Sequence, residues 1–336
     1  MIIMAQSLTN NEIQISGLPS SVLRIALGTW AIGGWMWGGS DDNLAIKTIH
    51  DAVANGINLI DTAPVYGFGH SEEVVGKALA SLTDKKPFIA TKVGLSWDNG
   101  KVYRDSRPEI IRQGIEDSLR RLGVDTIALA QVHWPDNKTP IEDTAAELAK
   151  LRQEGKILSI GVSNYSADQM KVFQQAAPLA TSQDPLNIFE RATEKNTLPF
   201  VKENDMALLA YGPLCRGLLS GKITASSTFT GDDLRKTDPK FQAPRFEQYL
   251  KAVTELQALA DSKGKSLLAL AIRWVLDLGP TIALWGARKP EQVTNIRDAL
   301  DWSLSADDYR KIDDILARNT PDPIEPTFMA PPERQA

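Results

Sequence analysis

Short apolar runs alternate along the chain with longer stretches in which apolar residues recur at helical spacing. Eight runs have the length of buried strands: Val22 to Leu27, Ile57 to Ile60, Phe88 to Ala90, Thr126 to Val132, Ile157 to Val162, Leu179 to Ser182, Met206 to Ala210 and Thr281 to Trp285. Such runs, separated by helices, are typical of βα units, which are roughly 30 residues long. The pattern predicts a (β/α)₈ TIM barrel over residues 1–336 as one domain, with its core at about 20–318. A doubly wound sheet is disfavoured, as is a Rossmann site, because no G-x-G-x-x-G follows the first run.

Capping signals mark several of the helices between the runs. Asp41 opens a helix that ends near Gly56, and Ser71, followed by two glutamates, opens the next. Pro108 stands where the first residue of a helix is expected, and Gly123 ends that helix. We expect each of these helices to pack on the outside of the barrel.

Three segments depart from the repeat. Gly212 to Pro244, after the seventh run, is a long loop that we expect to be a cofactor-covering lid or a disordered segment. The tail, residues 319–336, carries five prolines and either wraps the surface or is loosely ordered. An early turn, Leu8 to Pro19, is predicted to form a small hairpin that plugs the bottom of the barrel.

Composition narrows the class of protein. The net charge is −5, with acidic and basic residues interspersed, so we expect no nucleic-acid or membrane partner. The one cysteine, Cys215, excludes an intrachain disulfide and fits a reducing compartment. It is either a redox sensor beside Arg216 or a small loop residue. Without a signal peptide or an 18-residue apolar run, we expect a cytoplasmic protein that starts at Met1 or Met4.

Polar residues follow every predicted strand. They are Thr29 and Trp30 after the first, Asp61 and Tyr66 after the second, Lys92 after the third, His133 after the fourth, Ser163 and Asn164 after the fifth, Gln183 after the sixth, Tyr211 after the seventh, and Gly286, Ala287 and Arg288 after the eighth. In a barrel these strand ends meet at one mouth, where the active site lies.

Four of these side chains suit carbonyl reduction. A Lys92 that ends a buried strand needs a carboxylate partner, which Asp61 can supply. The lysine charge is expected to lower the pKa of the Tyr66 phenol from its usual ~10 and make it a proton donor. His133 can donate a hydrogen bond to a substrate oxygen. Hydride has to come from a cofactor, because no side chain supplies it.

Five tryptophans cluster after the first, third and fourth strands: Trp30, Trp35, Trp37, Trp97 and Trp134. We interpret them as the wall of a narrow pocket for small carbonyl compounds. The predicted substrate pocket consists of Trp30, Tyr66, Trp97, His133 and Trp134.

Seven sequence segments resemble the aldo-keto reductase superfamily, in order over about residues 22 to 300. They are Ala26-Leu27-Gly28-Thr29-Trp30, Asp61-Thr62-Ala63 with Tyr66-Gly67, Thr91-Lys92, Gln131-Val132-His133, Gly161-Val162-Ser163-Asn164, Gly217-Leu218-Leu219-Ser220-Gly221-Lys222 and Gly286-Ala287-Arg288. The first and sixth are similar to bacterial members acting on glyceraldehyde and methylglyoxal. The resemblance implies a (β/α)₈ barrel and an NADP-preferring reductase or dehydrogenase.

The resemblance also implies roles for individual residues. Tyr66 would be the proton donor, Lys92 and Asp61 would tune it, and His133 would orient the carbonyl. Ser163, Asn164 and Gln183 would hold the nicotinamide amide, Tyr211 would stack on its ring, Arg288 would bind the 2′-phosphate, and Gln292 would face the adenine. The full cofactor set is Thr29, Trp30, Asp61, Ser163, Asn164, Gln183, Tyr211, Gly212, Pro213, Leu214, Arg216, Gly217, Leu219, Gly221, Lys222, Arg235, Gly286, Arg288, Gln292 and Asn295, with no metal site.

The sequence thus predicts an NADP(H)-dependent reductase of small aldehydes and 2-oxoaldehydes, reversible toward polyol oxidation. Asn295 and Ile296 stand where the family commonly has an acid and an asparagine, so the adenine pocket is altered. Two alternatives stay open: a cofactor-binding regulatory subunit resembling the potassium-channel β-subunits, and a barrel isomerase or lyase. The protein could also form a homo-oligomer.

Overall fold

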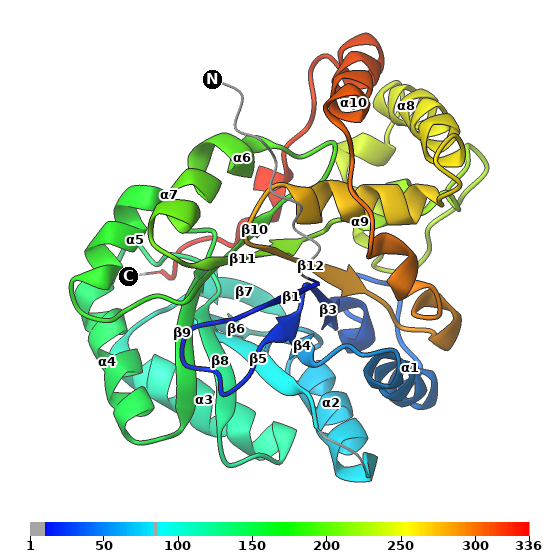
Figure 1. Cartoon of the computed structure of the whole chain (residues 1–336). Coiled ribbons are helices and arrows are strands. Elements are labelled where there is room, and N and C mark those ends of the chain that lie inside the picture. Colours follow the sequence, from blue (N-terminus) through cyan, green and yellow to red (C-terminus); the bar gives the residue numbers. More distant parts are fainter. Residues whose placement is uncertain (1–10, 84–85, 336) are drawn as a thin grey trace.

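Eight parallel strands pair side by side and close into a barrel in the computed structural model, which describes residues 11–83 and 86–335 (Figure 1). They are β3 (Ile25–Gly28), β4 (Leu59–Asp61), β5 (Phe88–Val93), β8 (Ile127–Val132), β9 (Ile157–Ser163), β10 (Thr181–Pro185), β11 (Ala207–Tyr211) and β12 (Thr281–Gly286). Each strand coincides with one predicted run, so the predicted (β/α)₈ barrel is confirmed. All but β8 continue one to three residues beyond the run. Polar residues extend the strands because ladder hydrogen bonds use the backbone alone.

Helices surround the barrel. They are α1 (Asp42–Ala54), α2 (His70–Ser81), α3 (Pro108–Leu122), α4 (Ile141–Gln153), α5 (Ala167–Gln174), α6 (Ala192–Asn196), α7 (Leu198–Glu203), α8 (Arg245–Asp261), α9 (Leu267–Asp277) and α10 (Ala306–Asn319). The Asp41 side chain accepts from Leu44 N at 3.0 Å and caps α1. Pro108 is the first residue of α3, and Gly123 ends it in the left-handed conformation, as predicted.

The predicted start of α2 at Ser71 is wrong. The N-cap is Gly69, and Ser71 lies inside the helix, fully buried. Its hydroxyl donates to Thr29 Oγ1 at 2.8 Å and accepts from Thr62 Oγ1 at 3.0 Å. Ser71 therefore ties α2 to the ends of β3 and β4 instead of capping the helix.

An apolar cluster fills the lower part of the barrel, which is closed at the bottom by a hairpin. Strands β1 (Glu12–Ile13) and β2 (Val22–Leu23) pair antiparallel, and β1 lies across the front of the barrel in Figure 1. The hairpin buries Ile15, Leu18 and Val22 in the same apolar cluster as the barrel-lining residues. Full burial of one such side chain stabilises the fold by about 1.5–3 kcal/mol. The bottom plug is confirmed, although its hairpin spans 12–23; residues 8–10 of the predicted turn lie outside the described part.

The long loop after β11 is ordered. It contains the short 3₁₀ helices η2 (Cys215–Ser220), η3 (Leu234–Lys236) and η4 (Pro239–Phe241). The Asp232 carboxylate accepts from Met36 N at 2.7 Å and from Gly38 N at 3.0 Å, and Leu234 N donates to Met36 O. These bonds tie the loop to the segment that follows β3, across the mouth of the barrel.

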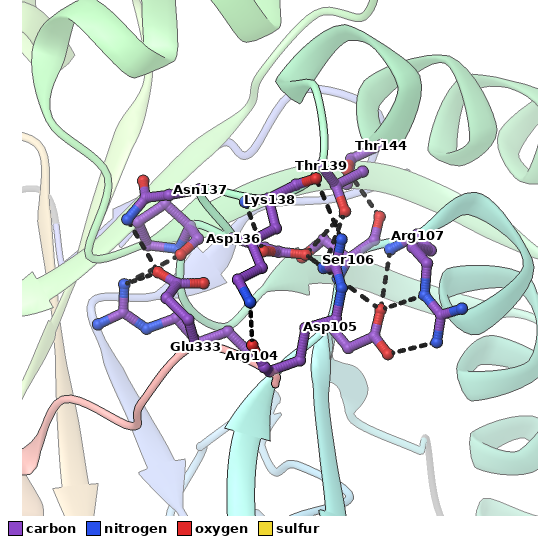
Figure 2. A network of polar contacts seen from close by, with 12 residues as sticks. Arg104, Asp105, Ser106, Arg107, Asp136, Asn137, Lys138, Thr139, Thr144 and Glu333 are labelled. Carbon is purple, nitrogen blue, oxygen red and sulfur yellow. Dashed lines mark hydrogen bonds and ion pairs between the residues drawn. The ribbon is translucent and has the colours of Figure 1, made fainter. Parts of the chain in front are cut away.

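The tail wraps the surface, as one of the two predictions stated. It crosses a second hairpin, β6 (Leu95–Asp98) and β7 (Lys101–Arg104), which the sequence did not predict. Arg104 N donates to Pro332 O at 2.9 Å, and the Arg104 guanidinium contacts the Glu333 carboxylate at 3.1 Å. Arg334 pairs with the buried Asp136, three residues after His133. Figure 2 shows Glu333 between Arg104 and Asn137 in this network.

In the part of the chain that the structure describes, none of the helices combines the length and the apolar character needed to cross a membrane.

Candidate active site

A buried ion pair lies where β4 and β5 run side by side. Lys92 Nζ is 2.6 Å from Asp61 Oδ2 and 3.0 Å from Thr62 O, and it donates to Tyr66 Oη at 3.2 Å. The Lys92 and Asp61 side chains are 0% and 3% exposed. Burial alone lowers the pKa of Lys92, but the Asp61 charge and the nearby Tyr66 raise it above the usual value. The lysine therefore stays cationic, with its three hydrogens directed at three oxygens.

Tyr66 reaches Lys92 from a turn that is held by two glycines. Tyr66 N donates to Ala63 O at 3.1 Å, which closes the turn after β4. A Cβ on Gly33 would lie only 2.5 Å from Tyr66 C, and a Cβ on Gly67 would overlap Gly33 O. Side chains at these two positions would push the segment after β3 away from the tyrosine. The close backbone approach thus fixes where the phenol stands.

The predicted lowering of the Tyr66 pKa is wrong in its net direction. Burial raises the pKa of the phenol more than the Lys92 charge lowers it, and the Asp61 charge adds to the increase. The prediction considered the effect of the Lys92 charge on the pKa of Tyr66, but not the larger effect of losing hydration on burial. A raised pKa keeps the phenol protonated at neutral pH, which is the form that donates a proton.

His133 completes the group from the end of β8. Its backbone N donates to Val93 O at 2.9 Å, and its ring meets the Tyr66 ring edge-on, with centroids 5.9 Å apart. Burial, followed by the charge of Lys92, lowers the pKa of His133 well below its usual value. The imidazole is therefore neutral at neutral pH and can donate or accept one hydrogen bond.

The second oxygen of Asp61 is held by two buried carboxamides. Gln183 Nε2 donates to Asp61 Oδ1 at 2.9 Å, and Gln131 Nε2 lies 3.3 Å from the same oxygen. Gln131 is not among the site residues predicted from the sequence, although it lies in the Gln131-Val132-His133 motif. A polar residue inside the apolar run of β8 was the signal that could have identified it.

The residues after β9 and β11 form a connected polar group. Asn164 Nδ2 donates to His133 O at 3.0 Å, and Tyr211 Oη donates to Asn164 Oδ1 at 2.9 Å. The Ser163 hydroxyl donates to Gln183 O at 2.8 Å. The structure therefore brings Ser163, Asn164, Gln183 and Tyr211 together beside His133, as the strand-end pattern predicted. The Thr29 hydroxyl, by contrast, is buried against Asp61 O at 2.9 Å.

The Arg216 side chain is buried in an ion-pair cluster, although the sequence placed it among the cofactor contacts. Its guanidinium pairs with Glu190 and Asp238, and Lys240 Nζ lies 2.8 Å from Glu190 Oε1. All four side chains are at most 4% exposed. A buried guanidinium paired twice is not available to a phosphate, so only the backbone at this position can face a cofactor. The cluster anchors the base of the long loop.

The other loop residues of the predicted cofactor set follow β11 in the segment 212–222. Gly212, Gly217 and Gly221 have positive φ angles, so the chain turns there as only glycine does readily. Of the remaining loop positions, Pro213 and Leu219 are buried, Leu214 is partly buried and Lys222 is exposed.

Two arginines, Arg235 of the loop and Arg288 after β12, lie close to Trp37. Arg288 Nη1 donates to Trp37 O and Gly39 O, at 2.8 and 2.7 Å. Arg235 pairs with Asp233 and covers the rings of Phe229 and Trp37. Arg235 and Arg288 thus place two positive charges beside Trp37.

The residues at the predicted adenine side, Gln292, Asn295 and Ile296, differ in their surroundings. Gln292 Oε1 accepts from Arg288 N at 2.9 Å and from Lys289 N at 3.0 Å, so this oxygen caps its own turn. Asn295 is exposed, whereas Ile296 is fully buried in the apolar core. Ile296, which departs from the family pattern, therefore contributes to packing. A Cβ on Gly286 would meet nothing within 4 Å, so there is open space beside this residue.

The tryptophans form two groups instead of one wall. Trp30 stacks on Tyr66, with centroids 6.0 Å apart, and meets Trp37 edge-on at 5.5 Å. The second group is built around Phe68, which lies 4.9 Å from the ring of Trp35 and 5.5 Å from that of Trp97. Trp134 lies apart under the Arg104 guanidinium, 5.3 Å away. Phe68 was not predicted, although it lies in the turn two residues after Tyr66 and is aromatic like the tryptophans it contacts.

Cys215 is a small buried loop residue and not a reactive thiol. It is fully buried, and burial raises its pKa far above the usual value, an effect that the Glu190 charge reinforces. The charge of Arg216, which suggested a thiolate, is outweighed.

The Aldo/keto reductase family model matches residues 24–317 of the chain. The chain belongs to the aldo/keto reductase family. It is 52% identical over 315 residues to "Aldo-keto reductase YhdN" of Bacillus subtilis (strain 168), which covers 93% of this chain and 95% of that protein. It is 37% identical over 298 residues to the "NADH-specific methylglyoxal reductase" of Escherichia coli (strain K12), over 84% of this chain and 91% of that protein.

A solved structure is similar to the barrel over nearly its whole length. The glycerol dehydrogenase AKR11B4 from Gluconobacter oxydans superposes with a TM-score of 0.88 at 58% identity, covering 95% of this chain and 99% of that one. As an aldo/keto reductase, the protein is an oxidoreductase that uses a nicotinamide cofactor. The residues present fit such a group. Amide and hydroxyl side chains adjoin His133, the cations Arg235 and Arg288 both contact Trp37, and there is open space beside Gly286.

Proposed function

We propose that this aldo/keto reductase is an NADPH-linked enzyme that reduces short aldehydes and 2-oxoaldehydes to alcohols and works reversibly toward polyol oxidation. The observation that carries the proposal is the contact of one buried cation, Lys92, with both Asp61 and Tyr66 Oη at the barrel mouth. We also propose that barrel and tail act as one domain of a cytoplasmic protein.

In this mechanism each member of the tetrad has one task. When bound, the nicotinamide supplies the hydride that adds to the carbonyl carbon. Tyr66 Oη gives its proton to the carbonyl oxygen, so the product is the neutral alcohol. Lys92 stabilises the phenolate that is left, and Asp61 keeps Lys92 charged. The neutral His133 donates a hydrogen bond that orients the carbonyl oxygen.

The substrate class is supported by the pocket and by two relatives. Trp30 stacks on Tyr66 and meets Trp37, and Phe68, two residues after Tyr66, packs against Trp97; these aromatic surroundings suit a small substrate. The E. coli relative is named for methylglyoxal and the Gluconobacter structure for glycerol. Both compounds have three carbons, and one is a 2-oxoaldehyde while the other is a polyol.

A substrate panel tests the proposal. Purified protein is incubated with glyceraldehyde, methylglyoxal, larger aldehydes and glycerol, and the nicotinamide absorbance is followed with NADPH and with NADH. We expect turnover of the short carbonyls and faster reaction with NADPH. Cofactor binding without turnover would support the regulatory-subunit alternative, and no cofactor binding would point to an isomerase or lyase.

Arg288 is the proposed partner of the 2′-phosphate. Replacing it by alanine removes a charge-assisted contact of about 1.5–3 kcal/mol, so KM for NADPH should rise roughly ten- to a hundredfold. NADH lacks this phosphate and serves as the internal control, with KM nearly unchanged. Arg288→Lys keeps the charge and should fall between the two. Equal losses for NADPH and NADH in Arg288→Ala would remove the assigned role, and the NADH-specific E. coli relative makes this comparison necessary.

A further inference from the structure

Gln131 is a fully buried carboxamide among the reacting groups, and the mechanism proposed for the tetrad does not use it. It lies on β8, pairs in register with Lys92 on β5 and with Gly161 on β9, and precedes His133 by two residues. Its Nε2 is 3.3 Å from Asp61 Oδ1, and its Oε1 is 3.4 Å from Gln183 Nε2. Gln131 thus lies between the carboxylate of the ion pair and the carboxamide of β10.

The neighbouring strand leaves space for the Gln131 side chain because it has a glycine, Gly161, at the paired position. A Cβ on Gly161 would stand 3.1 Å from Gln131 Cγ and would overlap Thr181 Oγ1. A larger residue at this position of β9 would clash with Thr181 and crowd the glutamine side chain. A buried amide without partners destabilises a protein by about 1–3 kcal/mol, so a carboxamide in a space of this shape needs its hydrogen bonds.

Charge fixes the orientation of both carboxamides. Asp61, ionised and paired with Lys92, can only accept hydrogen bonds, so each glutamine must direct its NH₂ group toward Oδ1. Gln131 Oε1 then accepts the remaining hydrogen of Gln183 Nε2. With both hydrogens of that NH₂ group engaged inward, Gln183 is left with its carbonyl oxygen to offer. An acceptor is the group that the NH₂ of a nicotinamide amide requires.

We propose that Gln131 is a positioning residue: it locks the Gln183 carboxamide so that its oxygen accepts from the nicotinamide amide, and it joins that group to the Asp61–Lys92 pair. The proposal rests on the proposed function only in assigning a nicotinamide to Gln183. It accounts for a polar residue in an otherwise apolar strand and for the glycine opposite it.

A binding experiment tests the proposal without catalysis. Gln131→Met, Gln183→Met and the double variant are titrated with NADPH and with 2′-phospho-ADP-ribose, which lacks the nicotinamide. We expect Gln131→Met to raise the NADPH dissociation constant about two- to tenfold, the range of one hydrogen bond, and to leave 2′-phospho-ADP-ribose binding unchanged. The double variant should be no worse than Gln183→Met, because Gln131 acts through Gln183.

Gln131→Glu gives a second test with a pH readout. A protonated acid can still donate to Asp61 and accept from Gln183, whereas a carboxylate repels Asp61 and loses its donor. The NADPH dissociation constant of this variant, divided by that of the unchanged protein, should therefore rise with pH, while the ratio for 2′-phospho-ADP-ribose stays flat. A flat NADPH ratio, multiplicative effects in the double variant, or equal losses for both ligands would overturn the proposal. These outcomes are distinct from a failure of the proposed reductase activity, because none of them requires turnover.

Discussion

Replacing Tyr66 by phenylalanine should lower kcat for carbonyl reduction by about 10²- to 10⁴-fold, the contribution typical of a general acid, and leave cofactor binding nearly intact. The change removes only Oη, which accepts from Lys92 Nζ at 3.2 Å. The ring keeps its stack on Trp30 and its edge contact with His133, so the pocket wall is retained. Single-turnover oxidation of bound NADPH by glyceraldehyde measures the chemical step, and quenching of protein fluorescence measures cofactor binding.

Tyr249→Phe is the matched control for this change. It also removes a buried phenolic oxygen, one that accepts from Ile324 N at 2.9 Å outside the site. Its kcat should stay within about twofold of the unchanged protein, since a substitution away from the site acts mainly on stability. If Tyr66→Phe kept most of its activity, another group would be the proton donor.

Lys92→Met should be the most damaging single change for both stability and activity. It leaves the carboxylate of Asp61 buried without its cation, and breaking a buried pair in this way costs about 3–5 kcal/mol. The phenol of Tyr66 also loses the one charge that lowers its pKa, while burial and Asp61 continue to raise it. Urea unfolding should show the loss in the free energy of unfolding, and reduction should fall at least as far as in Tyr66→Phe.

A second substitution separates the two effects of Lys92→Met. Adding Asp61→Asn removes the uncompensated charge, so much of the lost stability should return. Activity should not return, because no cation then faces the phenol. If the single variant were as stable as the unchanged protein, or if the double variant recovered activity, the ion pair would not have the role assigned to it.

The barrel and the core of the site follow from the sequence because both depend on strand order. Parallel strands that are consecutive in the chain place their carboxyl ends side by side, so Asp61 and Lys92 had to be neighbours once β4 and β5 were recognised. The same reasoning brought Asn164 and Tyr211 to the mouth. Side chains at strand ends are predictable because the backbone ladder fixes their positions.

Two kinds of feature could not be predicted from the sequence: contacts between loops, and the net result of opposing effects on a pKa. From the sequence, Arg216 is a cation in a glycine-rich loop and suits a contact with phosphate. In the structure it is paired with Glu190 and Asp238, which lie more than 20 positions away in the chain. The pKa of Tyr66 depends on the extent of burial, which no residue pattern measures. The tail is held in position by the ion pair between Arg334 and the buried Asp136, which the proline content of the tail does not indicate.

The pH dependence of both reaction directions tests most directly whether Tyr66 moves the proton. With its pKa above ~10, the phenol stays protonated, so reduction at saturating NADPH should be constant through neutral pH and fall only in the alkaline range. Alcohol oxidation needs the phenolate and should rise with pH over the same alkaline range. The pKa of His133 lies well below ~6.5, so a histidine acid would instead make reduction fall as pH rises through the acidic range. A reduction rate lost between acidic and neutral pH would contradict the account.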